Sequence, residues 1–179
     1  MPHIQINNPL PGISGLLKQY PHTCKPLCDL AETLLRGAST ISSADRELIA
    51  AYVSHLNDCN FCHSSHASAA ACHYGNDYAP IDWVLQDPQA APFTPKLKAF
   101  LALAARVQQG GKKVTESDIA EARLQGATDD EIHQVVLIAA AFCMFNRYVD
   151  GLATQAPRER EAYRESGRIM AEVGYIRER

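Results

Sequence analysis

The sequence predicts an all-α domain, and three observations support this class. Apolar residues recur three and four positions apart in several segments, which is the pattern of amphipathic helices. Residues that begin and end helices stand at the borders of these segments. No segment shows the two-residue alternation of a strand over a convincing length. The 179 residues are enough for a single domain with a sizeable core.

The first part of the chain is predicted to be an extended arm followed by a helix. Residues 1–24 contain four prolines and two glycines, which favour an extended N-terminal arm. Residues 25–35 then carry an apolar stripe at helical spacing that includes Leu27 and Leu34. Gly37 ends this helix.

The middle of the chain is predicted to hold five helices, over residues 43–56, 59–74, 81–85, 95–109 and 116–125. Gly75 ends the second of these helices. Thr94 caps the fourth, with Pro95 at its first position. Thr115 with Asp118 resembles a capping box for the fifth.

The last part of the chain is predicted to form one long helix and one terminal helix. Thr128 and Glu131 form a capping box for a helix over residues 129–152. Because this helix is nearly apolar all round through its middle, we expect it at the centre of the core or at an oligomer interface. Pro157 stops it, and residues 156–179 are expected to carry a charged C-terminal helix.

Residues 47–75 contain the side chains on which the functional prediction depends. Cys59 and Cys62 form a CxxC pair, and His66 follows Cys62 by four positions in a run rich in alanine. On a helix, residues three or four apart share one face. Both thiols and the imidazole are therefore expected to reach one small volume.

Glu47 is predicted to join this group from the preceding helix. Asn57 and Asp58 are residues typical of a turn, so the two flanking helices are expected to form an antiparallel hairpin. In such a hairpin Glu47 lies within about one turn of His66. Glu47 is thus placed to orient His66, and His66 to reach Cys62.

This arrangement suits an activated thiol. The thiolate is the nucleophile, and the pKa of a thiol falls at a helix N-terminus, beside an imidazole and within CxxC. We predict that Cys62 is the nucleophile, that His66 takes its proton and that Glu47 orients and charges His66. The reverse order of the sulfurs stays open, because Cys59 is nearer the helix end and expected to be more exposed to a reductant.

The spacing of Glu47, Cys59, Cys62 and His66 resembles the alkylhydroperoxidase AhpD core within the carboxymuconolactone decarboxylase-like family, and most of all its peroxidase-related branch. The similarity covers about residues 25–155, which we expect to form the helical core. Gly75 and the segment from Phe145 to Asp150 add weaker support.

The resemblance implies an all-helical oligomer, a dimer, trimer or hexamer, that reduces a hydroperoxide. One cysteine attacks the hydroperoxide, the other closes a disulfide, and a dithiol or disulfide reductant protein resets the pair. No cofactor and no metal ion are implied. The better-known members carry a histidine directly before the second cysteine, where Phe61 stands here and His63 follows the cysteine instead.

Two other functions are compatible with the same residues. A lactone decarboxylase would use Glu47 and His66 as acid and base and would not require the thiols. A non-enzymatic zinc-binding or redox-sensing module would use Cys59, Cys62 and His66 as three metal ligands and would need a fourth.

The charge and composition of the chain limit the classes of partner and the compartment that we expect. The net charge of −3 does not favour nucleic acid or an anionic membrane as a partner. The first residues lack the features of a signal peptide, and the apolar run over residues 135–145 is too short to span a bilayer. Six irregularly spaced cysteines suit thiols in a reducing compartment, so we expect a cytoplasmic protein.

Overall fold

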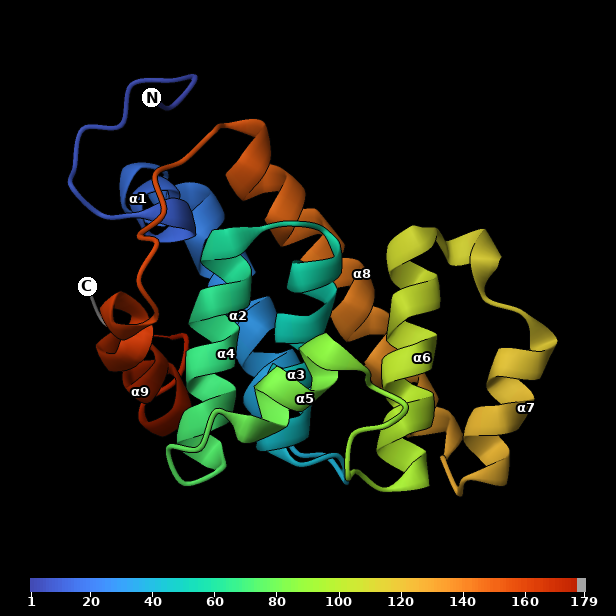
Figure 1. The fold of residues 1–179 in the computed structure, drawn as a ribbon. Helices are drawn as coiled ribbons and strands as arrows, with labels where there is room; N and C mark the ends of the chain where they lie inside the picture. Colours follow the sequence, from blue (N-terminus) through green and yellow to red (C-terminus); the bar gives the residue numbers. More distant parts are fainter. Residues whose placement is uncertain (177–179) are drawn as a thin grey trace.

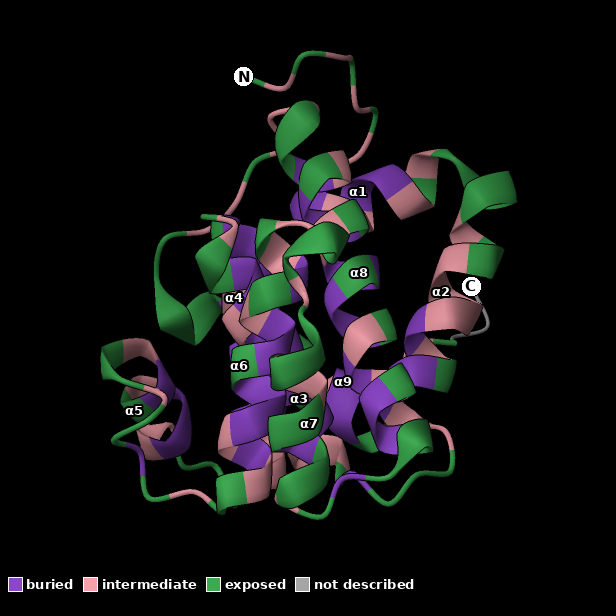
Figure 2. Cartoon of the chain, turned by 90° about the vertical axis from the view of Figure 1, so that its right-hand side faces the viewer, coloured by how far each residue is buried: buried purple, intermediate pink, exposed green. Residues whose placement is uncertain are grey.

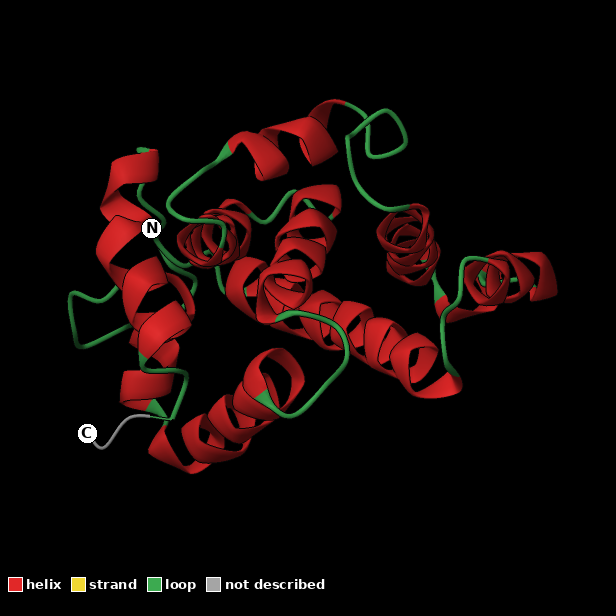
Figure 3. Ribbon diagram, turned by 90° about the horizontal axis from the view of Figure 1, so that it is seen from below, coloured by secondary structure: helices red, strands yellow, loops and turns green. Residues whose placement is uncertain are grey.

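The computed structural model describes residues 1–176 and confirms the all-α class. The described part of the chain forms helices and loops without a strand (Figure 3). In chain order the elements are α1 (Gly12–Gln19), α2 (Pro21–Arg36), α3 (Ser43–Leu56), α4 (Asn60–His73), α5 (Ala79–Gln86), α6 (Pro95–Gln109), the 3₁₀ turn η1 (Gly111–Lys113), α7 (Glu116–Leu124), α8 (Asp129–Gly151), the 3₁₀ turn η2 (Arg160–Tyr163) and α9 (Arg164–Glu172).

The antiparallel hairpin of α3 and α4 forms the centre of the fold (Figure 1). The Ser42 side chain caps α3 by accepting the N–H of Asp45 at 3.1 Å. The predicted turn is present at Asn57 and Asp58, and Asp58 takes the left-handed conformation (φ 58°) that aspartate tolerates. The two helices approach closely because small residues face each other in the core, among them Ala50, Ala51, Ala67, Ala70 and Ala71.

The long helix α8 lies across this hairpin. Its first turn has the predicted capping box of Thr128 and Glu131. Its 23 residues make it long and apolar enough to cross a membrane by length and composition alone. In this fold it packs against α3 and α6, and Val135, Ile138 and Phe142 are buried there. It therefore acts as a core helix, with the buried residues on its inner side (Figure 2).

Helix α9 packs on the side of α4 opposite to α6 (Figure 1). The contact depends on Gly167, because a Cβ at this position would lie 2.3 Å from the Ser68 Oγ of α4. Tyr163 and Met170 turn inward from the same segment. The C-terminal segment is thus amphipathic and belongs to the core packing.

Two predicted borders are wrong. The extended arm over residues 1–24 is extended only to residue 11, since α1 and the start of α2 follow. A contact with a distant part of the chain holds this segment in place, because the Gly12 N–H donates to the carbonyl of Gln155 at 2.8 Å. The single helix expected near the C-terminus is divided into η2 and α9, and residues 177–179 lie outside the described part.

Candidate active site

The cysteine pair lies at the start of α4. Cys59 occupies the N-cap position with extended backbone (φ −90°, ψ 92°), and the His63 N–H donates to its carbonyl at 2.9 Å. Cys62 is therefore in the first turn, where backbone N–H groups of the helix lack intrahelical acceptors. His66 follows one turn later on the same face. The structure thus brings Cys62 and His66 to one side of α4, and their catalytic roles stay a prediction.

Glu47 and His66 form a direct pair between α3 and α4. The Glu47 Oε2 and the His66 Nδ1 are 2.7 Å apart, and Glu47 is completely buried. A carboxylate at this distance accepts the Nδ1–H, which leaves the lone pair on Nε2. The predicted hairpin geometry thus gives a histidine whose second nitrogen is a base.

Tyr175 completes this group and was not predicted from the sequence. Its hydroxyl donates to the Glu47 Oε1 at 2.5 Å and lies 3.3 Å from the His66 Nδ1. Its ring is stacked on the imidazole, with centroids 6.0 Å apart and an interplanar angle of 15°. Burial of the hydroxyl and the adjacent Glu47 charge raise the pKa of Tyr175 well above its ordinary value, so the phenol remains a donor.

A clamp from α2 holds Tyr175 in place. Glu32 accepts the Tyr175 N–H at 2.7 Å, and the Arg36 guanidinium pairs with Glu32 at 3.2 Å. Arg36 also donates to the carbonyls of Met170, at 3.1 Å, and Ala171, at the end of α9. Gly174 has φ +108°, and a Cβ there would lie 2.5 Å from the Glu32 Oε2. We call Glu32 and Arg36 the α2 clamp.

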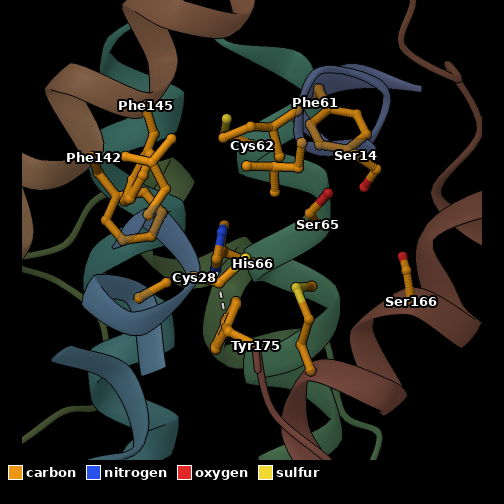
Figure 4. A pocket seen from close by; sticks show the side chains of 15 residues that line it. Ser14, Cys28, Phe61, Cys62, Ser65, His66, Phe142, Phe145, Ser166 and Tyr175 are labelled. Carbon is orange, nitrogen blue, oxygen red and sulfur yellow. Dashed lines mark hydrogen bonds between the residues drawn. The ribbon is translucent and has the colours of Figure 1, made fainter. Parts of the chain in front are cut away.

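A cavity of about 150 Å³ lies in front of Cys62 and His66 (Figure 4). Its wall is mainly apolar, with a few sulfur, hydroxyl and imidazole groups, and comprises Ile13, Ser14, Leu17, Leu27, Cys28, Ala31, Phe61, Cys62, Ser65, His66, Phe142, Phe145, Ser166, Met170 and Tyr175. Five helices and the Tyr175 segment therefore enclose it. An apolar cavity with few polar groups suits a small organic ligand.

Phe61 is part of this wall. Gly12 of α1 lies against it so closely that a Cβ on Gly12 would be 2.2 Å from the ring. The residue that replaces the family histidine thus closes the cavity by packing. Tyr52 of α3 and Trp83 of α5 lie outside the wall.

Cys59 lies behind Cys62, away from the cavity. Its relative exposure is 1%, against 3% for Cys62, so the expectation that Cys59 is the more exposed sulfur is wrong. Its backbone at the N-cap turns its side chain inward, where it packs with Val149 and Tyr163. The sulfur order therefore cannot be inferred from nearness to the helix end.

The Cys59 thiol is held in its protonated form. A hydrogen bond with Cys62, burial, the negative charge of an ionised Cys62 and a hydrogen bond to the Asp150 carboxylate all raise the pKa of Cys59. Burial raises the pKa of Asp150 itself, and the charge of Asp58 adds to this, while the bond to Cys59 opposes it. This contact was not predicted from the sequence, because α8 meets α4 only in the folded chain.

His63 and Asn146 have structural contacts instead of site contacts. The His63 Nδ1 is 3.0 Å from the Ala51 carbonyl of α3, and burial lowers the pKa of His63. Asn146 donates to the Ser54 Oγ at 3.0 Å and accepts from Asn57 at 2.8 Å, which ties α8 to the hairpin.

Metal ligands do not gather around the cysteines. Within residues 1–176 no group of three or more histidine, cysteine, aspartate and glutamate side chains is arranged to hold a metal ion. The His66 Nδ1 is already occupied by Glu47.

Fold and site together define a helical protein in which one cysteine of a CxxC pair and the histidine of a Glu–His pair line one apolar cavity. Residues 21–106, which include the complete α3–α4 hairpin, match the carboxymuconolactone decarboxylase family. Over these residues the chain is similar to that family, and its fold is that of AhpD-like proteins. No curated protein matches the sequence significantly.

Solved structures show the same fold. An uncharacterized peroxidase-related protein with an alkylhydroperoxidase AhpD core from Ralstonia eutropha superimposes with a TM-score of 0.76 at 22% identity, covering 89% of this chain and 82% of that one. An uncharacterized peroxidase-related protein from Silicibacter gives 0.75 at 24% identity, covering 86% and 80%. A protein of unknown function from Agrobacterium tumefaciens, described as a candidate antioxidant defence protein AhpD, gives 0.69 at 21% identity, covering 80% and 97%.

Proposed function

We propose that the chain is a thiol-dependent alkylhydroperoxide reductase with an antioxidant role. The observation that carries this proposal is the cavity itself, in which Cys62 and His66 face one apolar space while Glu47 holds His66 from behind. An organic hydroperoxide has an apolar body and a polar O–OH end, and these match the apolar wall and the thiol-imidazole group. The names of the structural relatives agree with peroxidase chemistry.

In the first step the Cys62 sulfur attacks the terminal oxygen of the hydroperoxide. His66 Nε2 takes the Cys62 proton, and the thiolate forms an S–O bond while the O–O bond breaks. The proton on His66 then passes to the departing alkoxide, which leaves as an alcohol. Sulfur is oxidised to a sulfenic acid, and the hydroperoxide is reduced by two electrons.

In the second step Cys59 resolves the sulfenic acid. Its sulfur attacks the Cys62 sulfur, an S–S bond forms and hydroxide leaves, taking the Cys59 proton to become water. The raised pKa of Cys59 supports this order, because a sulfur that keeps its proton is the poorer first nucleophile. Asp150 is the nearby group through which this proton could pass.

A dithiol or disulfide reductant protein would return the pair to its reduced form. Two electrons and two protons then pass to the Cys59–Cys62 disulfide, and the reductant becomes a disulfide. We place this cycle in the cytoplasm, where such reductants are abundant.

The test is a thiol count by intact mass before and after one equivalent of cumene hydroperoxide, with peptide mapping. We expect the loss of two hydrogens and a Cys59–Cys62 link as the first product. With Cys28, the other thiol of the cavity wall, changed to serine, Cys59→Ser should keep a sulfenic acid at Cys62, while Cys62→Ser should form none. The opposite pattern would reverse the sulfur order, and an unchanged mass would refute the proposed function.

A second candidate function is a carboxymuconolactone-decarboxylase-type lyase. It is favoured by the family match and by the Glu47–His66 pair, which is complete without sulfur. Activity on a lactone carboxylate that survives in the Cys59→Ser/Cys62→Ser double variant would establish it. Loss of all activity in that variant would count against it.

We also propose that the chain forms a homo-oligomer through α8. Leu137 and Met144 are exposed on one stripe of this helix, with relative exposures of 38% and 44%. Residues seven apart lie on the same helix face, so another copy could cover both. Light scattering on the purified protein should give a mass above that of one chain, and Met144→Glu should lower it.

A further inference from the structure

A second pair of sulfurs lies on α2. The Sγ atoms of Cys24 and Cys28 are 3.7 Å apart, against about 2.05 Å in a disulfide bond. Both side chains are partly exposed, whereas Cys59 and Cys62 are buried. No disulfide is present among the described residues.

Cys28 faces the cavity that contains Cys62 and His66. It reaches the wall from α2, while Cys62 and His66 reach it from α4 (Figure 4). The second pair thus shares a cavity with the candidate active site. Cys24 lies one turn nearer the start of α2, where the neighbouring residues Thr23 and Lys25 are exposed.

The Cys59–Cys62 pair is buried and the Cys24–Cys28 pair is partly exposed, which bears on how a reductant protein could reach the active-site disulfide. A reductant must bring a thiolate in line with a sulfur of the disulfide. With exposures of 1% and 3%, Cys59 and Cys62 offer little room for a protein thiol to approach. A partly exposed pair that shares the cavity provides a route to the surface.

The first turns of α2 must tighten for Cys24 and Cys28 to form a disulfide. Residues four apart on a helix have Cβ atoms about 5–6 Å apart, and a disulfide needs about 3.5–4.5 Å. Pro26 lies between the two cysteines inside the helix and has no N–H to donate to the carbonyl four residues earlier. The turn that must tighten therefore lacks one of its stabilising hydrogen bonds.

We propose that Cys24 and Cys28 form a second redox pair that takes over the disulfide from Cys59–Cys62 and presents it to an external dithiol. This proposal rests on the proposed function. First the Cys28 sulfur attacks the Cys62 sulfur, the Cys62–Cys59 bond breaks, and the proton of Cys28 passes to Cys59. Then the Cys24 sulfur attacks the Cys28 sulfur, Cys62 leaves, and it receives the proton of Cys24.

The result is a Cys24–Cys28 disulfide and a reduced Cys59–Cys62 pair. Two electrons and two protons have moved from α2 to α4, so the first exchange requires no outside reagent. A small or protein dithiol then reduces Cys24–Cys28 and becomes a disulfide itself. The active-site pair is ready for the next hydroperoxide before the reductant arrives.

The test follows disulfides over time after one equivalent of cumene hydroperoxide, using acid quench, alkylation and peptide mapping. In the wild-type protein the Cys59–Cys62 link should appear first and the Cys24–Cys28 link later, as the first declines. Cys28→Ser should stop at Cys59–Cys62, and Cys24→Ser should accumulate a Cys28–Cys62 link. Cys72→Ser is the matched control, since Cys72 is also partly exposed but lies outside the cavity, and it should behave as wild type.

Two results would overturn the proposal. One is a wild-type protein in which Cys59–Cys62 persists while Cys24 and Cys28 remain fully alkylated. The other is a Cys24–Cys28 link that forms at the same rate in Cys62→Ser, because the pair is then oxidised directly. If hydroperoxide oxidises no cysteine, the proposed function fails, and the relay is read separately by oxidising Cys24→Ser with diamide and mapping the Cys28–Cys62 link.

Discussion

Replacing Tyr175 by phenylalanine tests whether the Glu47–His66 pair needs its third member. The substitution removes one hydroxyl, which donates to the Glu47 Oε1 at 2.5 Å, and keeps the ring that stacks on His66. Glu47 is completely buried, so water does not replace this donor easily. A hydrogen bond to a charged group is worth about 1.5–3 kcal/mol.

If this whole stabilisation acts on the transition state, the rate of Cys62 oxidation falls. One decade of rate corresponds to about 1.36 kcal/mol, so the expected loss is roughly tenfold to hundredfold. We expect it in the second-order rate constant for cumene hydroperoxide, measured by stopped flow at several pH values. The pH profile should also change, because the hydroxyl acts on the proton-transfer pair and not on the fold alone.

Tyr74→Phe is the matched control. The Tyr74 hydroxyl also donates to a carboxylate, the Asp45 Oδ1, at 2.7 Å, but it lies outside the cavity. Both variants lose a phenol–carboxylate bond, and both should lose some thermal stability. If Tyr175→Phe keeps the rate and pH profile of Tyr74→Phe, Tyr175 has no positioning role.

Three further changes test other parts of the site. Glu47→Gln keeps the size of the side chain but removes the charge that supports His66, so peroxide turnover should fall by about 10²–10⁴, and an unchanged rate would exclude the relay. The pKa of Cys59 is raised in the fold, so the unfolded chain loses this proton first and the stability it contributes is lost as pH rises above about 8.5. Denaturant unfolding of the reduced protein should therefore give a lower unfolding free energy at pH 10 than at pH 7. This difference should be smaller in Asp150→Asn, because the carboxylate that helps to raise the pKa of Cys59 is gone. An equal difference in both proteins would show that Asp150 does not raise this pKa. Gly167→Ala places a Cβ 2.3 Å from the Ser68 Oγ and should cost about 1–3 kcal/mol of unfolding free energy, with only partial recovery in a Ser68→Ala background because the Ser68 Cβ is itself 2.5 Å away.

The α3–α4 hairpin was predictable because its determinants are local. Helical spacing places Cys62 and His66 on one face, and the turn at Asn57 and Asp58 fixes how far Glu47 lies from them. The contact of 2.7 Å between Glu47 and His66 follows from these two facts. The all-α class was predictable for the same reason, since each helix carries its own periodic pattern and end signals.

The remaining parts of the site depend on contacts between distant segments. Tyr175 lies 109 residues after His66, and no periodic pattern links the two positions. Asp150 was visible as a polar residue at the end of α8, but its neighbour Cys59 is defined only when α8 crosses α4. Helix α1 was missed because its two glycines and the prolines on either side of it indicate extended chain, while its place is held by contacts with Phe61 and Gln155.

The α2 clamp also sets an order of events during synthesis. Glu32 and Tyr175 are separated by 143 residues, so Glu32, Glu47, both α4 cysteines and His66 all leave the ribosome well before Tyr175. Because chains are made from the N-terminus onward, the hairpin can form while the last wall of the cavity does not yet exist. In a nascent chain the α4 cysteines would therefore be in place but accessible to oxidants from solution. When Tyr175 binds to the α2 clamp, it adds the missing part of the cavity wall over Cys62 and His66.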